Sequence, residues 1–208
     1  MTVNCGGVIL CGGESRRMGR PKADLPFGDE PLVVRVVRRL ADSVAPVVVV
    51  AAAHQRLPEL PEGTLVARDR EPGQGPLPAL LLGLESLPAA VDAALVTACD
   101  VPFLEPAVIE RLIAVLGDAD AAAAHVEGRC HPLPAVYRTR LVPLAARLIE
   151  SGERRLGRLL EQASTVALDE AQLRSLDPQL TSFQNLNHPQ DYAAALERAA
   201  ASAEPDRG

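Results

Sequence analysis

The chain has 208 residues, a length that suits one domain, and 48% of them are hydrophobic although only 2% are aromatic. Its formal net charge of −6 excludes the broad basic surface that nucleic-acid-binding proteins need. No apolar run reaches the roughly 18 residues of a membrane helix, and the N-terminus lacks the basic region and cleavage site of a signal peptide. We therefore expect a cytoplasmic protein that binds neither membrane nor nucleic acid.

Apolar runs alternate with helical patterns along most of the chain. In chain order they predict a strand at 4–10, a helix at 31–40, strands at 46–53 and 64–67, a helix at 77–87, a strand at 93–98, a helix at 106–116, strands at 120–126 and 132–138, helices at 141–150 and 153–161, a strand at 164–168 and a closing helix at 189–200. This alternation is typical of an α/β protein with a largely parallel sheet and helices on both faces. We expect one domain over residues 1–200 and a disordered tail at 201–208.

Unusual segments follow several of the predicted strands. They are the loop after Leu10, the loop at 69–76, Asp100, and the stretch around Asn185. In open α/β sheets, ligands bind beyond the carboxyl ends of the strands. The shared position of these segments therefore predicts a binding site at that edge. The cysteines form no CxxC pair, which argues against a zinc site, and Cys5, Cys11 and Cys99 are expected to be buried in apolar surroundings.

The loop that begins at Cys11 combines adjacent glycines with positive charge. Gly12 and Gly13 allow backbone N–H groups to approach a ligand closely. Basic side chains follow within one short stretch, at Arg16, Arg17, Arg20 and Lys22. The loop matches neither the P-loop nor the GxGxxG pattern. Phosphate binding is one interpretation, and a solvated charged turn is the alternative.

Lys22 is exceptional in this composition. The chain has 21 basic residues, and Lys22 is the only lysine among them. A position that retains lysine indicates a need for a compact ammonium rather than a planar guanidinium, although a single lysine can also arise by chance.

Asp100 directly follows the apolar strand at 93–98. It is a candidate Mg²⁺ ligand, because Mg²⁺ is held by one or two carboxylates together with substrate phosphates and water. The alternative is a capping role for the helix at 106–116, for which Glu105 is better placed. Asp69 also follows a strand, and a turn role before Gly73 is nearly as well supported as a ligand role.

The sequence offers no obvious general base beside these residues. An acceptor that is already an ionised phosphate needs no deprotonation, so attack on an α-phosphate requires only positioning and charge neutralisation. The pattern therefore favours transfer of a nucleotidyl group to a phosphate.

The stretch from Leu10 to Lys22 resembles the signature LxGGxSxRMGxxK. This signature belongs to the MobA-like nucleotidyltransferases of the molybdenum cofactor, and the chain most closely resembles the guanylyltransferases among them. The resemblance spans about residues 5 to 195, and it continues in these segments: Asp69 with Gly75-Pro76-Leu77, Cys99-Asp100-Val101-Pro102, His131-Pro132, Gly152-Glu153-Arg154-Arg155, and Phe183-Gln184-Asn185-Leu186-Asn187.

The family resemblance implies a three-layer α/β/α Rossmann-like nucleotidyltransferase fold with GTP and Mg²⁺ as co-substrates. The acceptor would be molybdopterin cofactor, and the products a guanine dinucleotide cofactor and pyrophosphate. It also implies transient contacts with cofactor-biosynthesis proteins and recipient apo-enzymes. The roles it implies are nucleotide contacts for Leu10, Cys11, Gly12 and Gly13, a phosphate contact for Lys22, a nucleoside contact for Asp69 and metal binding for Asp100.

We assign further roles to residues in the same segments. Lys22 and Arg17 would offset charge that develops on the phosphates, and Asn185 or Asn187 would complete the metal corner as neutral ligands. Arg154 and Arg155 would meet the acceptor, or else form a solvated helix start. Two departures from the family are visible: Ala52 stands where relatives offer a polar residue near the base, and Arg20-Pro21 stands where an acidic residue is common.

Three alternatives stay open at this point. The first is a cytidylyltransferase that performs the same chemistry with CTP, and the second is a sugar-nucleotide pyrophosphorylase with a similar glycine-rich loop. The third is a carrier module without catalytic activity. Lys22 and Asp100 favour an enzyme, because a carrier has no leaving group to stabilise.

Overall fold

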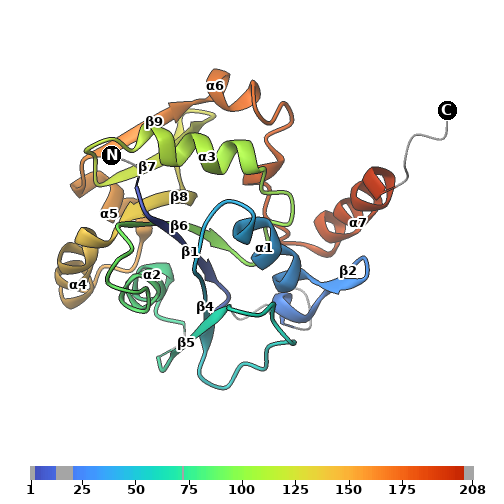
Figure 1. Ribbon diagram of the computed structural model, residues 1–208, viewed down its shortest axis with the longest axis horizontal. Helices are drawn as coiled ribbons and strands as arrows, with labels where there is room; N and C mark the ends of the chain where they lie inside the picture. The colour runs from blue at the N-terminus through green and yellow to red at the C-terminus, as the bar shows by residue number, and fades with distance from the viewer. Residues whose placement is uncertain (1–2, 13–20, 72, 204–208) are drawn as a thin grey trace.

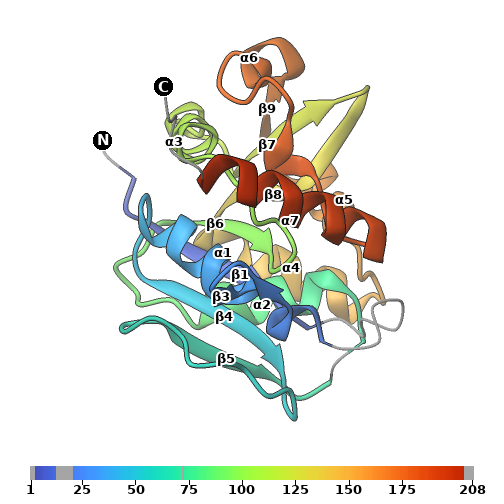
Figure 2. The same ribbon diagram turned by 90° about the vertical axis from the view of Figure 1, so that its right-hand side faces the viewer.

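A seven-stranded sheet forms the centre of the computed structural model, which describes residues 3–12, 21–71 and 73–203 (Figure 1). The strands lie in the order β5-β4-β1-β6-β8-β7-β9. Their bounds are β1 Cys5–Leu10, β4 Val47–Ala52, β5 Leu65–Asp69, β6 Ala93–Ala98, β7 Ala121–Val126, β8 Arg129–Arg138 and β9 Thr165–Asp169. Only β8 runs antiparallel to its neighbours, so the sheet is mostly parallel. Figure 2 shows this order from β5 at the bottom to β9 at the top.

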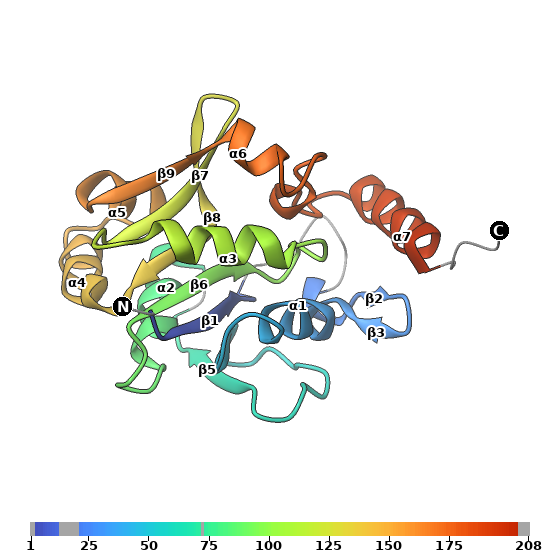
Figure 3. The same ribbon diagram turned by 45° about the horizontal axis from the view of Figure 1, so that its top comes forward.

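Helices cover both faces of the sheet (Figure 3). One face carries α1 Leu32–Ala41, α3 Pro106–Val115 and the short α6 Glu170–Arg174; the other carries α2 Pro76–Glu85, α4 Val142–Glu150 and α5 Leu156–Gln162. Single 3-10 turns lie at η1 Lys22–Asp24, η2 Thr139–Leu141 and η3 Thr181–Phe183. The three-layer α/β/α arrangement expected from the sequence is therefore confirmed.

The central strands owe their position to their apolar side chains. The run of four valines that opens β4 is at most 5% exposed, because helices bury it on both faces. Helix α1 presents Val33, Val36, Val37 and Leu40 to the sheet at helical spacing. The core therefore lies in two layers, one on each side of the sheet.

The last helix, α7 Pro189–Ala203, packs beside the sheet rather than on it (Figure 3). It lies against a small hairpin, β2 Pro26–Phe27 and β3 Glu30–Pro31, where the Tyr192 hydroxyl donates to the Pro26 carbonyl. Phe27, Phe103, Leu186 and Ala195 form a separate apolar cluster between them. This third cluster fixes the C-terminal segment next to the carboxyl end of β6.

Several boundaries differ from those expected from the sequence. Helix α5 begins at Leu156 rather than at residue 153, because the Arg154 carbonyl accepts from the Leu77 N–H (3.1 Å) and Arg155 is an extended N-cap. Strand β8 begins at Arg129 rather than at residue 132. The β2–β3 hairpin and α6 were not predicted, and α7 extends to Ala203. Glu105 does stand at the N-cap of α3, although its side chain makes no capping bond.

Among the described residues, no helix is both long and apolar enough to cross a membrane. Cys5, Cys11 and Cys99 are buried, as expected, whereas Cys130 is exposed.

The buried Cys5 thiol should make the free energy of unfolding decrease at alkaline pH. Burial raises the pKa of Cys5 from 9.0 to about 11, and a backbone hydrogen bond from Leu95 offsets part of this effect. The thiol of the unfolded chain therefore ionises first, so the free energy of unfolding falls as the pH rises from about 9 towards 11. We expect this thiol to contribute about 2 kcal/mol of the decline between about pH 8 and about pH 10.5 in urea titrations.

The comparison that isolates this effect uses Cys5→Ala, with Cys130→Ala as the exposed control. Cys5→Ala should show a shallower decline than the wild type, and Cys130→Ala should retain most of it. Equal declines in the wild type and in Cys5→Ala would contradict the assignment.

Candidate active site

The carboxyl ends of four parallel strands meet at one edge of the sheet. In the register of the sheet, Leu10 is paired with Ala98 and Val50, and Ala52 with Asp69. The loop after β1 leaves this edge at its centre, where the Cys11 N–H donates to the Val50 carbonyl (2.8 Å). Gly12 is exposed there, between the end of β4 and the end of β6. The sheet topology therefore brings together the segments that the sequence singled out.

Lys22, Asp100 and Asn187 form a polar corner on the β6 side of this edge. The Lys22 Nζ lies 2.5 Å from Asp100 Oδ2 and 3.0 Å from Asn187 Oδ1. The side chains of Lys22 and Asp100 are 17% and 9% exposed, so solvent screens their charges only partly. The structure thus unites three residues predicted from separate motifs, here called the Lys22–Asp100–Asn187 corner.

Backbone contacts hold the C-terminal segment in this corner. The Leu186 N–H donates to the Asp100 carbonyl (3.1 Å), and Leu186 is buried in the cluster beneath α7. Asp191 accepts from the N–H groups of Asn187 (3.0 Å) and His188 (2.8 Å). The position of Asn187 is therefore fixed from both sides.

Asp177 supports the same segment and was missed in the sequence. Its buried carboxylate accepts from the Ser182 N–H (2.8 Å), and the Ser182 hydroxyl accepts from the Glu105 N–H (3.0 Å). This chain of bonds ties the segment before Asn185 to the loop between β6 and α3. Asp177 lies in a segment of ordinary composition, so no local sequence pattern indicates its role.

The second carboxylate oxygen of Asp100 fits a cation. Asp100 is 6% exposed, and its buried Oδ1 has no hydrogen-bond partner among the described residues. A buried carboxylate oxygen without a partner is costly, and a bound Mg²⁺ would satisfy it. The described part of the chain holds no group of three or more His, Cys, Asp or Glu side chains that could bind a metal. Among the described residues, a cation at Asp100 would therefore find at most one further His, Cys, Asp or Glu ligand.

The buried Cys11 thiol at the end of β1 stays neutral. Cys99 donates its N–H to the Leu10 carbonyl (3.1 Å), which places Cys99 beside Cys11 at the ends of β6 and β1. The pKa of Cys11 is raised well above its usual value by its hydrogen bond to the Cys99 side chain, then by burial, and by the nearby Cys99 and Asp100 charges. A neutral Cys11 adds no negative charge where phosphates would bind.

Asp69 lies at the other side of the edge, at the end of β5. Its carbonyl accepts from the Ala53 N–H (2.8 Å), and its carboxylate accepts from the Glu71 N–H (2.9 Å). β4 and β1 separate β5 from β6, so Asp69 does not belong to the Lys22–Asp100–Asn187 corner. Its turn contact is the role that the sequence left open beside ligand binding.

Arg154 and Arg155 lie between α4 and α5 and bond mainly to their own neighbourhood. Arg154 donates to the carbonyls of Ile149 and Glu153 (2.8 Å each) and to Gln74 (3.3 Å). Arg155 makes a two-bond pair with Glu153, whose pKa falls to about 2 because of the Arg155 side chain and then the backbone N–H groups of Arg155 and Arg154.

Gly75 explains why Arg154 is held so closely. It has a φ of 95°, and a Cβ there would lie 2.9 Å from the Arg154 Cβ. The loop before α2 therefore packs directly on Arg154. Of the remaining predicted residues, Leu10 ends β1 and is partly buried, while Gly13 and Arg17 lie outside the described residues.

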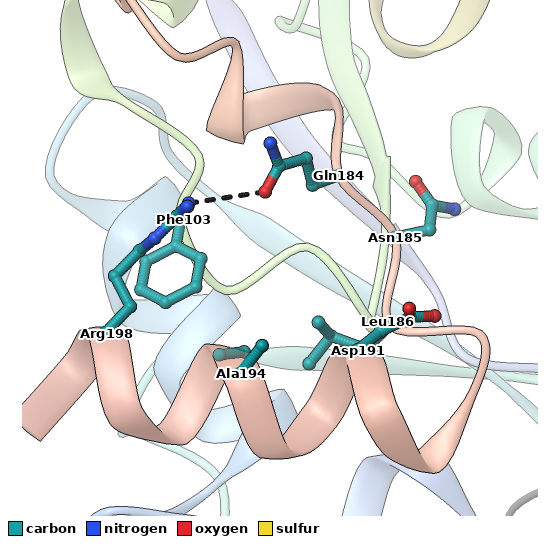
Figure 4. A pocket seen from close by; sticks show the side chains of 8 residues that line it. Phe103, Gln184, Asn185, Leu186, Asp191, Ala194 and Arg198 are labelled. Atoms are coloured by element: carbon teal, nitrogen blue, oxygen red, sulfur yellow. Dashed lines mark hydrogen bonds between the residues drawn. The ribbon is translucent and has the colours of Figure 1, made fainter.

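A cavity adjoins the corner between α7 and the segment at 184–186 (Figure 4). Its volume is about 320 Å³, and its lining includes Phe103, Asn185, Asp191 and Arg198. Figure 4 shows the Gln184 carboxamide, which accepts from Arg198 (3.2 Å), at one end of this space. The Asn185 side chain makes no hydrogen bond within the described part of the chain, so it is available to a ligand.

The family model of the MobA-like NTP transferase domain matches residues 7–168. The chain belongs to this family. A probable molybdenum cofactor guanylyltransferase of Mycobacterium tuberculosis (strain ATCC 25618 / H37Rv) is 44% identical over 180 residues, which cover 84% of this chain and 88% of the relative. The molybdenum cofactor guanylyltransferase of Rhodobacter capsulatus is 38% identical over 200 residues, covering 92% of this chain and 95% of the relative.

Solved structures show the same fold. Molybdopterin-guanine dinucleotide biosynthesis protein A from Archaeoglobus fulgidus has a TM-score of 0.77 at 24% identity, covering 94% of this chain and 99% of the other. The 2-C-methyl-D-erythritol 4-phosphate cytidylyltransferase of Thermus thermophilus has a TM-score of 0.71 at 19% identity, covering 96% and 100%. The fold is therefore shared with both of these proteins.

Substitution of Asp100 tests the cation assignment. Asp100→Asn preserves the shape of the side chain and an oxygen for Lys22 but removes the negative charge. We expect kcat/KM for nucleotidyl transfer, followed as pyrophosphate release, to fall by about 100-fold or more, and added Mg²⁺ not to restore it. Asp118→Asn, at an exposed position, is the matched control and should retain activity. Near-wild-type turnover of Asp100→Asn at moderate Mg²⁺ would remove Asp100 from the site.

Substitution of Lys22 tests the need for a compact ammonium. Lys22→Arg retains the positive charge, but the planar guanidinium is too large to keep both short contacts with Asp100 and Asn187. We expect kcat/KM to fall by about tenfold or more in steady-state kinetics. Arg111→Lys makes the reverse exchange at an exposed position and should have no effect. A loss of less than about threefold in Lys22→Arg would mean that either cation serves.

Proposed function

We propose that the protein transfers GMP from GTP to the terminal phosphate of molybdopterin cofactor. The products are molybdopterin guanine dinucleotide cofactor and pyrophosphate. The observation that carries this proposal is the Lys22–Asp100–Asn187 corner at the carboxyl ends of parallel strands, where α/β sheets bind ligands. The names of relatives that are 38% and 44% identical over most of the chain support the guanine nucleotide and the acceptor.

The reaction requires positioning more than proton transfer. An oxygen of the ionised acceptor phosphate attacks the α-phosphorus of GTP, and the bond from that phosphorus to the bridging oxygen of pyrophosphate breaks. The acceptor oxygen is already deprotonated, so the absence of an obvious general base in the sequence fits this chemistry. The protein's task is to align two anions and to offset their charge.

Lys22 and Asp100 exchange partners in this proposal. Without ligand, Lys22 is the counter-charge of a carboxylate that is 6% exposed. With GTP bound, Lys22 would contact the phosphates, and Asp100 with Asn187 would hold Mg²⁺. A bound Mg²⁺ supplies positive charge that polarises the phosphate oxygens. Asp100 would therefore have a positive partner in both states, which avoids an unpaired buried charge.

The rest of the site divides between nucleoside and acceptor. Leu10, Cys11, Gly12 and Asp69 lie where the nucleoside would extend from the corner towards β5. We place the acceptor on the Asn185 side, where the adjoining cavity of about 320 Å³ has room for a ring system.

Four further residues of the sequence prediction belong to this proposal, and only Arg154 has a different role from the one expected. Arg155 is exposed and stays a proposed acceptor contact, whereas Arg154 mainly holds the loop at Gly75. Gly13 and Arg17 keep their proposed phosphate roles, outside the described residues.

The product must be handed on, because a dinucleotide cofactor acts in another enzyme. We therefore also propose a cytoplasmic location and transient contacts with proteins that make the cofactor and with apo-enzymes that receive it. A cytidylyltransferase is the second candidate, since the fold is shared with one. The names of the relatives favour GTP over CTP.

The choice of base provides the test of the proposed function. With molybdopterin cofactor and Mg²⁺, kcat/KM for GTP should exceed that for CTP by about tenfold or more, because the wrong base leaves buried polar groups unpaired. Mass spectrometry should identify the guanine dinucleotide as product. A reaction without acceptor is the control and should release no pyrophosphate.

Gly12→Ala adds a second readout to this experiment. A Cβ at Gly12 would lie 3.9 Å from the Ala52 nitrogen, an ordinary contact, so the variant should fold. The added methyl group narrows the slot for the larger purine, so GTP use should fall more than CTP use. Equal rates for the two nucleotides in the wild type, or a preference for CTP, would replace the proposed function with the cytidylyltransferase.

A further inference from the structure

Gln55 folds back onto the end of β4 at the nucleoside side of the site. The Gln55 N–H donates to the Ala52 carbonyl (3.0 Å), and the Ala52 N–H donates to the Gln55 side-chain Oε1 (3.2 Å). These reciprocal bonds close a tight turn. The Gln55 side chain therefore lies over Ala52, at the position where the sequence shows no polar side chain.

Arg68 of β5 holds this turn in place. Its Nη1 donates to the Gln55 carbonyl (2.6 Å) and to the Ala52 carbonyl (3.3 Å). The Ala53 N–H donates to the Asp69 carbonyl (2.8 Å). The turn is thus tied to the adjacent strand by three hydrogen bonds, so the Gln55 amide is presented from a rigid support.

The bond from Ala52 determines which end of the Gln55 amide is available. Because Oε1 accepts from a backbone N–H, the Nε2 group provides two N–H donors. Nε2 has no hydrogen-bond partner among the described residues, and Gln55 is half-buried. A Cβ at Gly12 would lie 3.9 Å from the Ala52 nitrogen, the same nitrogen whose N–H donates to Gln55 Oε1, so Gly12 and the Gln55 amide both adjoin Ala52.

The position of the amide separates it from the charged corner. Gln55 and Ala52 lie on the β4 side of Gly12, whereas Asp100 and Lys22 lie on the β6 side. A nucleotide with its phosphates at the corner would extend its base towards β4.

We propose that Gln55 is a specificity-determining residue, whose Nε2 donates a hydrogen bond to the O6 carbonyl oxygen of guanine. This inference rests on the proposed function. A donor at this position accepts a carbonyl and rejects an exocyclic amino group, which adenine carries at C6 and cytosine at C4. Gln55 thereby supplies the base contact that Ala52 cannot make.

Two substitutions separate base reading from support of the turn. Gln55→Leu removes both the acceptor for Ala52 and the donors for the base. Gln55→Glu retains an oxygen that can accept from the Ala52 N–H but has no N–H donor. Gln162→Leu, at an exposed position at the end of α5, is the matched control.

The measurements are kcat and KM with GTP, ITP and ATP, and the Kd of each nucleotide without acceptor. ITP retains O6 but lacks the 2-amino group, so it should follow GTP in every variant. In Gln55→Leu we expect KM and Kd for GTP to rise by about tenfold, with kcat within about twofold and ATP little changed. Gln55→Glu should weaken GTP at least as much and narrow the preference for GTP over ATP further.

Two results would overturn the inference. One is a GTP-to-ATP preference in Gln55→Leu within about twofold of the wild type. The other is restoration of GTP binding by Gln55→Glu, which would show that only the turn matters. Failure of the proposed function is distinguishable from both, because the wild type would then show no preference for GTP before any substitution is made.

Discussion

The contact between Lys22 and Asp100 is the interaction on which the site depends. A carboxylate that is 6% exposed needs a positive partner, because an unpaired buried charge is strongly destabilising. The partner is 78 residues away in the sequence, and Asn187, which shares the ammonium, is 165 residues from Lys22. Only the completed fold can bring these three groups together. The Lys22–Asp100–Asn187 corner therefore forms only when β1, β6 and the C-terminal segment have all folded.

Strands β1 and β6 and the C-terminal segment together position the residues of this contact. β1 and β6 end side by side, with Leu10 paired to Ala98, so the glycine loop and Asp100 leave the sheet together. The C-terminal segment is held at this edge by two kinds of contact. Leu186 anchors it to the Asp100 carbonyl, and α7 covers Leu186 from outside. The apolar packing of α7 thus supports a polar site, because it holds Asn187 at 3.0 Å from the Lys22 ammonium.

The site also has a direction along the edge of the sheet. Lys22 and Asp100 lie on the β6 side of Gly12, and the uncharged Gln55 amide, whose turn Arg68 holds, lies on the β4 side. Phosphates and a base have the same contrast in polarity, and a nucleotide joins them through a ribose. The proposed placement of the nucleotide uses this contrast, with its phosphates at Lys22 and Asp100 and its base at Gln55.

The sequence predicted the central strands well, and the polar residues that follow them do lie at the carboxyl edge of the sheet. β1, β4 and β6 are apolar runs long enough to be recognised, and a polar residue directly after such a run falls at the carboxyl edge. The start of α5 was predicted wrongly because the Arg154 carbonyl bonds to Leu77, a contact across 77 residues that no local pattern records. The β2–β3 hairpin has strands of two residues, too short for any period.

Gln55 and Asp177 were missed for a related reason. Each is a single polar residue in a segment of ordinary composition, and its role arises from where the chain folds back. Gln55 gains its role from the Ala52 N–H and from Arg68, and Asp177 from Ser182. Local sequence specifies the elements, whereas the fine geometry of the site depends on contacts between them.

A crystal structure of the protein with GTP and Mg²⁺ would test the central claim most directly, because that claim is an exchange of partners at Asp100. The account predicts an Asp100 carboxylate oxygen at about 2.1 Å from the metal, and the Lys22 Nζ within about 3 Å of a phosphate oxygen rather than of Asp100. A structure in which the Lys22–Asp100 pair persists while metal and phosphates bind elsewhere would contradict it.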